Sequence, residues 1–94
     1  MGTDDGDDVR VWLVERTYGD DELNIVILTY ATLDGERYFR KERALTSFTG
    51  PSRETTAAVE VDPNDLGRTP EEDREHFADA ARRTAERNAP DDAI

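Results

Sequence analysis

Residues 23–43 read LNIVILTYATLDGERYFRKER, and this stretch decides the fold of the chain. Its first half, residues 23–32, is the strongest run of apolar and β-branched residues in the sequence, which is typical of a β-strand. Asp34-Gly35 follows, a dipeptide that favours the two-residue type I′ turn of a β-hairpin because both positions adopt positive φ. Residues 36–43 then return as a second strand. The stretch therefore predicts an antiparallel hairpin in which the numbers of paired residues sum to 69.

Further strands are expected on either side of the hairpin. Residues 9–16 are rich in β-branched and aromatic residues, and residues 55–61 carry a weaker pattern of the same kind. Residues 44–48 suit either a continued strand or a short turn. Trp12 is expected in the core, because burial of a large aromatic side chain contributes much of the hydrophobic stabilisation of a small domain.

A helix is predicted after the fourth strand. Residues 69–72, TPEE, place a hydroxyl at the N-cap, proline at N1 and glutamate at N3, which is a capping box. Residues 88–90, NAP, end the helix. Its apolar stripe is mostly alanine around Phe77, which indicates close packing on a sheet. The expected fold class is therefore α+β: an antiparallel β-meander of three to four strands packed by one C-terminal helix.

The charge of the chain indicates the medium in which it works. It has 23 acidic and 12 basic residues among 94, a net charge of −11, and a single lysine, Lys41. The carboxylates are spread over the whole chain, whereas a mimic of nucleic acid would concentrate them in one block. This distribution is typical of proteins from salt-loving archaea, since molar salt screens the self-repulsion of a compact acidic domain. We therefore expect a halophilic-type, cytoplasmic protein.

One domain is expected between two acidic tails. Residues 1–8 are interpreted as a flexible tail, residues 9–89 as a single α+β domain, and residues 90–94 as a short C-terminal tail. The sequence has no cysteine, which excludes disulfides and thiolate metal sites. No apolar run approaches the roughly 18 residues of a membrane-spanning helix, and the acidic start differs from a secretory signal.

One face of the predicted hairpin gathers aromatic and basic side chains. In the expected register Tyr30 lies opposite Phe39, and residues two apart along a strand share a face. Ile25 and Ile27 belong to the other face. The candidate binding residues are Val26, Leu28, Tyr30, Arg37, Phe39, Lys41 and Arg43.

The apolar members of this face predict a protein interface. The strand at residues 23–32 is apolar on both faces, and only one helix is available to cover them. An exposed apolar stripe is therefore expected, formed by Val26, Leu28 and Tyr30 or by Ile25 and Ile27. Homodimerisation through this face, or docking of another protein there, is the favoured function, with the basic members orienting the partner. One competing explanation is that Tyr30 and Phe39 form a packed cross-strand pair, with the stems of the lysine and arginines over apolar neighbours. Another is that residues 44–54 fold over the face.

Binding of single-stranded nucleic acid is the alternative use of the same face. Tyr30 and Phe39 would stack on bases, and Arg37, Lys41 and Arg43 would hold phosphates. Three or four phosphate contacts lose roughly 10⁴- to 10⁵-fold in affinity between about 0.1 and 3 M salt. The salt-adapted composition therefore disfavours this alternative.

No catalytic or metal-binding constellation is evident, and we expect neither an enzyme nor a cofactor. His76 is the only histidine, and Glu72 and Asp79 lie on its side of the predicted helix. A closed metal site would need a fourth ligand, and general-base chemistry would need a nucleophile nearby. Residues 62–67, DPNDLG, superficially resemble a calcium loop, but a turn that leads into the helix explains them better.

Overall fold

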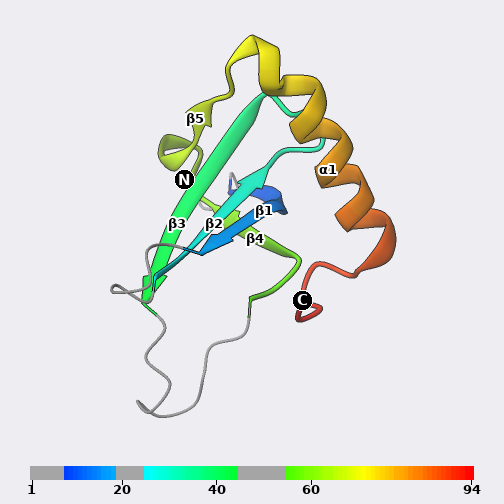
Figure 1. Ribbon diagram of the computed structural model, residues 1–94. Coiled ribbons are helices and arrows are strands. Elements are labelled where there is room, and N and C mark those ends of the chain that lie inside the picture. The colour runs from blue at the N-terminus through cyan, green and yellow to red at the C-terminus, as the bar shows by residue number, and fades with distance from the viewer. Residues whose placement is uncertain (1–7, 19–24, 45–54) are drawn as a thin grey trace, which may run out of the picture.

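The computed structural model describes residues 8–18, 25–44 and 55–94, and these form an α+β fold (Figure 1). An antiparallel sheet of five strands in the order β4-β1-β2-β3-β5 is packed by one C-terminal helix. The elements are β1 (Val9–Tyr18), β2 (Ile25–Ala31), β3 (Arg37–Ala44), β4 (Ala58–Val61), β5 (Gly67–Arg68) and α1 (Arg74–Arg87). The expected fold class is confirmed, and β5 is an addition to it. By sequence, residues 44–48 suit either a strand or a turn. Residue 44 is the last residue of β3, and residues 45–48 lie outside the described residues.

The β2–β3 hairpin has the predicted register but a different turn. Tyr30 pairs with Phe39 and Leu28 with Lys41, so the numbers sum to 69 as expected. The amide of Gly35 donates to the carbonyl of Thr32 at 2.8 Å, which places a β-turn at residues 32–35 instead of a two-residue turn at Asp34-Gly35. The register survives because both kinds of connection leave Thr32 opposite residue 37.

The sheet is open and strongly curled. β2 ends at Ala31, opposite Trp12, so residues 9–11 of β1 pair only with β4. A β-bulge between Leu13 and Glu15 shifts the β1–β2 register, and bulges bend a strand and increase its twist. In the view of Figure 1, β4 passes behind β2.

The connection from β4 to β5 requires this curl. It joins the two edge strands of the sheet, which a flat sheet would hold about 19 Å apart. The connection includes a 3₁₀ turn at Pro63–Asp65, so its six steps reach only about 16 Å. Asp62 starts the turn by accepting a hydrogen bond from the amide of Asn64 at 2.8 Å. The segment is therefore a turn, as expected, but it leads into β5 and not directly into the helix.

Two clusters of apolar side chains lie on opposite faces of the sheet. The concave face buries Val11, Leu13, Val26, Leu28 and Tyr30. The convex face packs Trp12 of β1, which is 7% exposed, against Ala81 of α1, as expected for a core tryptophan. The helix thus covers the face opposite the candidate binding face.

The predicted capping box is not formed. The α-helix begins at Arg74, after a 3₁₀ turn at Glu71–Asp73, and its N-cap residue is Asp73. Thr69 continues from β5 and donates its amide to the carbonyl of Glu36 at 3.0 Å. Its side chain is buried, and its hydroxyl has no hydrogen-bond partner among the described residues, so it does not cap the helix.

The segment expected as a C-terminal tail is hydrogen-bonded to the chain that leads into β4. Ala57 donates its amide to the carbonyl of Asp92 at 2.8 Å, and Ala58 donates to Pro90 at 3.0 Å. Figure 1 shows the C-terminus returning beside the start of β4. Residues 90–94 therefore cover part of the outer edge of this strand.

Candidate functional site

The apolar members of the candidate face belong to the core. Val26, Leu28 and Tyr30 are 5%, 0% and 2% exposed, and the Tyr30 ring lies 6.2 Å from the ring of Phe39 at 43°. The expectation of an exposed apolar stripe on this face is therefore wrong. The reason is the curl of the sheet, which packs β4 and Leu66 against the same cluster.

Two polar members of the face, Arg37 and Lys41, lie outside the buried cluster. Arg37 and Lys41 are exposed on β3, and Phe39 between them is half-buried. Arg43 lies opposite Val26 in the register, farther along the same strand. Six of the candidate residues thus divide into a buried group on β2, Val26, Leu28 and Tyr30, and an accessible group on β3, Arg37, Phe39 and Lys41.

The structure adds Arg68 to the accessible group. β5 pairs with β3 so that Arg68 lies directly opposite Arg37, and opposite residues of antiparallel strands share a face. Three exposed cations, on Arg37, Lys41 and Arg68, therefore share a face with the half-buried ring of Phe39, which lies between Arg37 and Lys41 along β3. We refer to these four residues as the basic strip. Sequence reasoning missed Arg68 because a two-residue strand that starts with glycine shows no alternation of apolar and polar residues.

Within the described residues, no ion pair neutralises the cations of the basic strip. In residues 8–18, 25–44 and 55–94 the ion pair present is Arg10–Glu60, at 2.7 Å on the β1–β4 ribbon. Cations placed opposite each other across two strands destabilise a sheet. A chain with 23 carboxylates thus leaves its cations on this strip available to an external anion.

The turn beside the strip is held by Asp34. The hydroxyl of Thr32 donates to its carboxylate at 2.6 Å and the amide of Glu36 donates to the same oxygen at 2.9 Å. These hydrogen bonds, the first more than the second, lower the pKa of Asp34, and the charge of Arg37 contributes in the same direction. The basic strip therefore begins, at Arg37, directly after a turn that is stabilised by hydrogen bonds.

The other candidate sites among the described residues are the hollow along β4 and the surroundings of His76. An open hollow of about 540 Å³ lies along β4, where Arg10 and Glu60 face Pro90 and Asp91. His76 is exposed on α1, with its ring 6.0 Å from that of Phe77. Across the described ranges, no group of three or more histidine or carboxylate side chains could hold a metal ion.

Comparison with known proteins identifies a family. A model described as a family of unknown function, DUF7967, matches residues 5–94. The chain belongs to this family. The match covers all the strands and the helix of this DUF7967 domain, so the curled sheet and the basic strip lie within the matched region. No curated protein and no solved structure matches the chain.

The helix of this DUF7967 domain is an element that packs on a sheet. None of the helices in the described ranges combines the length and the apolar character needed to cross a bilayer. The buried residues of α1 are Ala81, which packs in the cluster with Trp12, and Ala78, which lies beside Gly35 of the hairpin turn.

Proposed function

We propose that this chain is a protein-binding domain that acts through the β3 side of its sheet. The observation that carries the proposal is the basic strip, in which three exposed cations share a face with a half-buried aromatic ring. Arginine and aromatic residues are enriched where protein interfaces form, and the largest energetic contributions come from such side chains. The complementary partner is a protein surface rich in carboxylates. A second copy of this chain, with a net charge of −11, meets that description.

The composition supports a salt-adapted, cytoplasmic setting for this function. At molar salt the Debye length is about 3 Å, so only cations in direct contact with the partner contribute. Salt strengthens apolar contact, and the half-buried ring of Phe39 supplies it on the strip. A contact that combines Phe39 with hydrogen bonds is therefore better suited to this setting than a purely ionic one.

Binding of single-stranded nucleic acid is the second candidate, and Arg68 favours it by adding a cation beside Arg37. Burial of Tyr30 weighs against it, because one ring instead of two is available for stacking on bases. The net charge of −11 adds long-range repulsion of a polyanion. Protein binding is the better-supported proposal.

An NMR titration of the labelled chain in about 0.2 M KCl tests both candidates. The probes are polyglutamate, as an acidic polypeptide, and an oligothymidylate. We expect saturable shifts with polyglutamate at the amides of Arg37, Phe39, Lys41 and Arg68.

A double variant and a matched control make the titration specific. Arg37→Gln with Arg68→Gln should abolish the shifts, whereas Arg82→Gln with Arg83→Gln, which removes two exposed charges from α1, should leave them unchanged. Shifts with the oligonucleotide alone would favour the second candidate. The absence of saturable shifts with both probes, or shifts centred on α1, would overturn the assignment of the basic strip as a binding surface.

A further inference from the structure

We propose that the outer edge of β3 pairs with the same edge of a second copy of this chain, in antiparallel orientation, so that the two sheets join across a two-fold axis. The proposal goes beyond the proposed function of the basic strip, and it names the chain itself as the partner at a separate surface of β3. It concerns the backbone of β3 and the side chains on its convex face, whereas the basic strip lies on the concave side.

In the part of the chain that the structure describes, most of the outer edge of β3 has no strand partner. It is eight residues long, and β5 pairs with its first two residues, Arg37 and Tyr38. Within the described part of the chain, residues 39–44 have no strand on that side. An edge of this length is a template for the addition of another strand.

The hydrogen-bond pattern of the hairpin shows which backbone groups face outward. The amide of Thr32 donates to the carbonyl of Arg37 at 3.1 Å, which identifies these residues as a hydrogen-bonded pair. Because such pairs alternate along an antiparallel ladder, Phe39 and Lys41 turn their amide and carbonyl groups toward β2. Arg40 and Glu42 then turn theirs outward, toward an added strand.

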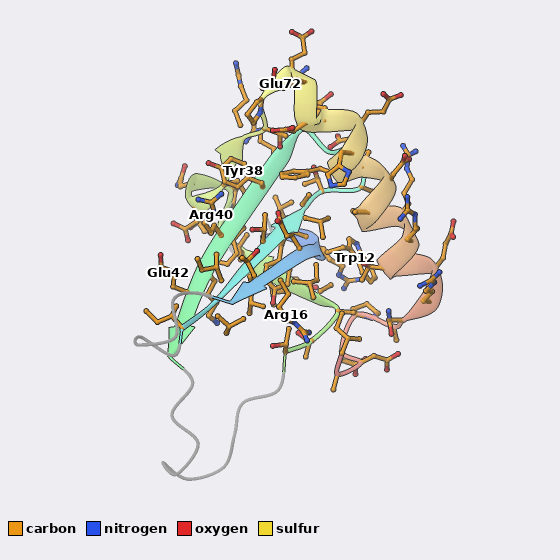
Figure 2. All side chains as sticks on the ribbon, viewed as in Figure 1. Trp12, Arg16, Tyr38, Arg40, Glu42 and Glu72 are labelled. Carbon is orange, nitrogen blue, oxygen red and sulfur yellow. The ribbon has the colours of Figure 1, made fainter. Side chains whose placement is uncertain are left out.

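One register pairs these outward residues with complementary charges. If residue numbers across the axis sum to 82, Arg40 lies opposite Glu42 of the second copy, and Glu42 lies opposite its Arg40. Both residues are exposed and lie on the convex face, since their partners in β2 are Thr29 and Ile27. Figure 2 shows the two labelled side chains beside β3, at the border of the molecule away from α1. Each pair exchanges two backbone hydrogen bonds, and opposite charges across strands add to them.

The neighbouring registers lose both charge pairs. A shift by two residues places Glu42 opposite Glu42, or Arg40 opposite Arg40, and like charges directly opposite are destabilising. The favoured register places Lys41 opposite Lys41 on the other face, and salt screens this repulsion. The order of charges along the edge is therefore self-complementary in one register, which argues for a second copy as the occupant.

Sedimentation equilibrium of the full chain, in about 0.2 M and about 2 M KCl, tests the proposal. We expect the wild-type chain to dimerise and Glu42→Arg to weaken the dimer roughly tenfold or more at the lower salt, since it places arginines opposite each other twice. Glu72→Arg makes the same change of charge at an exposed residue of the 3₁₀ turn before α1, and should leave the dimer intact (Figure 2).

Charge reversal provides the decisive control. Arg40→Glu combined with Glu42→Arg in one chain restores opposite charges across the axis, and should restore the dimer. The two single variants, mixed together, should form a heterodimer while each alone remains weaker than wild type. Circular dichroism checks that each variant is folded.

Two results would overturn the edge pairing: a folded wild-type chain that stays monomeric at about 1 mM, or a dimer that the charge reversals leave unchanged. Saturable binding of polyglutamate to the basic strip, together with either result, would retain the proposed protein-binding function and reject only the second copy as its partner on this edge.

Discussion

A Cβ atom placed on Gly35 would overlap the carbonyl oxygen of Arg74 and lie 2.8 Å from the amide nitrogen of Ala78. The same residue has φ of +75°, a conformation that favours glycine. We therefore expect Gly35→Ala to destabilise the domain by about 3 kcal/mol, since neither backbone group of α1 can move aside without disturbing the helix. Thermal unfolding followed by circular dichroism measures this loss.

Gly67→Ala is the matched control for that variant. Its added Cβ would meet the ring of Tyr38, 2.6 Å away at the nearest atom, and a side chain can rotate aside where a helix backbone cannot. We expect a loss of about 1 kcal/mol, well below that of Gly35→Ala. Equal losses for the two variants would contradict the close approach of the hairpin turn to α1.

Thr69 provides a second prediction at the scale of the residue. Its side chain is 1% exposed, and its hydroxyl has no hydrogen-bond partner among the described residues. Thr69→Val should leave stability unchanged or raise it by up to about 1 kcal/mol, because an unpaired hydroxyl is replaced by a methyl group of similar size. If the hydroxyl capped the helix, the same variant would instead lose about 1 kcal/mol. Urea denaturation distinguishes the two outcomes.

At the scale of the element, the bulge in β1 links the sheet to the helix. The hydroxyl of Thr84 in α1 donates to the carbonyl of Leu13 at 2.7 Å, at the residue where the β1–β2 register shifts. Thr84→Val should cost about 1–2 kcal/mol, because it leaves a buried carbonyl without a partner. Thr84→Ser keeps the hydroxyl and should lose less. A loss as large for serine as for valine would show that packing of the methyl group, and not the hydrogen bond, holds the helix on β1.

The bulge also explains which parts of the fold could be predicted from the sequence. Alternation and the Asp34-Gly35 turn define the register of the hairpin, and this register is confirmed. The alternation of side chains along each strand assigns Tyr30 and Phe39 to one face of the sheet, but it does not show that this face is concave. That depends on the bulge after Leu13 and on the short connection into β5, neither of which has a periodic signal.

The candidate site was predictable to the same limited extent. The spacing of two residues along the predicted strand placed Arg37, Phe39 and Lys41 on one face, and the structure leaves these residues accessible. The β2 members were predicted as exposed because one helix was available to cover two apolar faces. The sheet covers one of these faces itself by curling, and the same curl brings Arg68 beside Arg37.

At the scale of the whole molecule, the C-terminal segment determines which edges of the sheet are open. Residues 90–94 bond to the chain entering β4, and Arg16 donates to the carbonyl of Ile94. Removal of residues 90–94 should therefore destabilise the domain by about 2–3 kcal/mol, through the loss of several backbone hydrogen bonds. Urea denaturation measures the change. Asp91→Ser, which alters an exposed charge within the segment and keeps its backbone, should have little effect.

The truncation also changes how copies of the chain can assemble. In the full chain the amides of Ala57 and Ala58 are paired, so β3 provides the long open edge and a dimer closes on itself. Without residues 90–94 the chain would have a second open edge beside β4, and pairing through both edges would generate open-ended assemblies. We expect sedimentation velocity to detect species larger than a dimer for the truncated chain. Glu42→Arg in the truncated chain should shorten these assemblies, because it weakens one of the two contacts from which they grow. A truncated, folded chain that stops at the dimer would show that the β4 edge remains closed without the C-terminal segment.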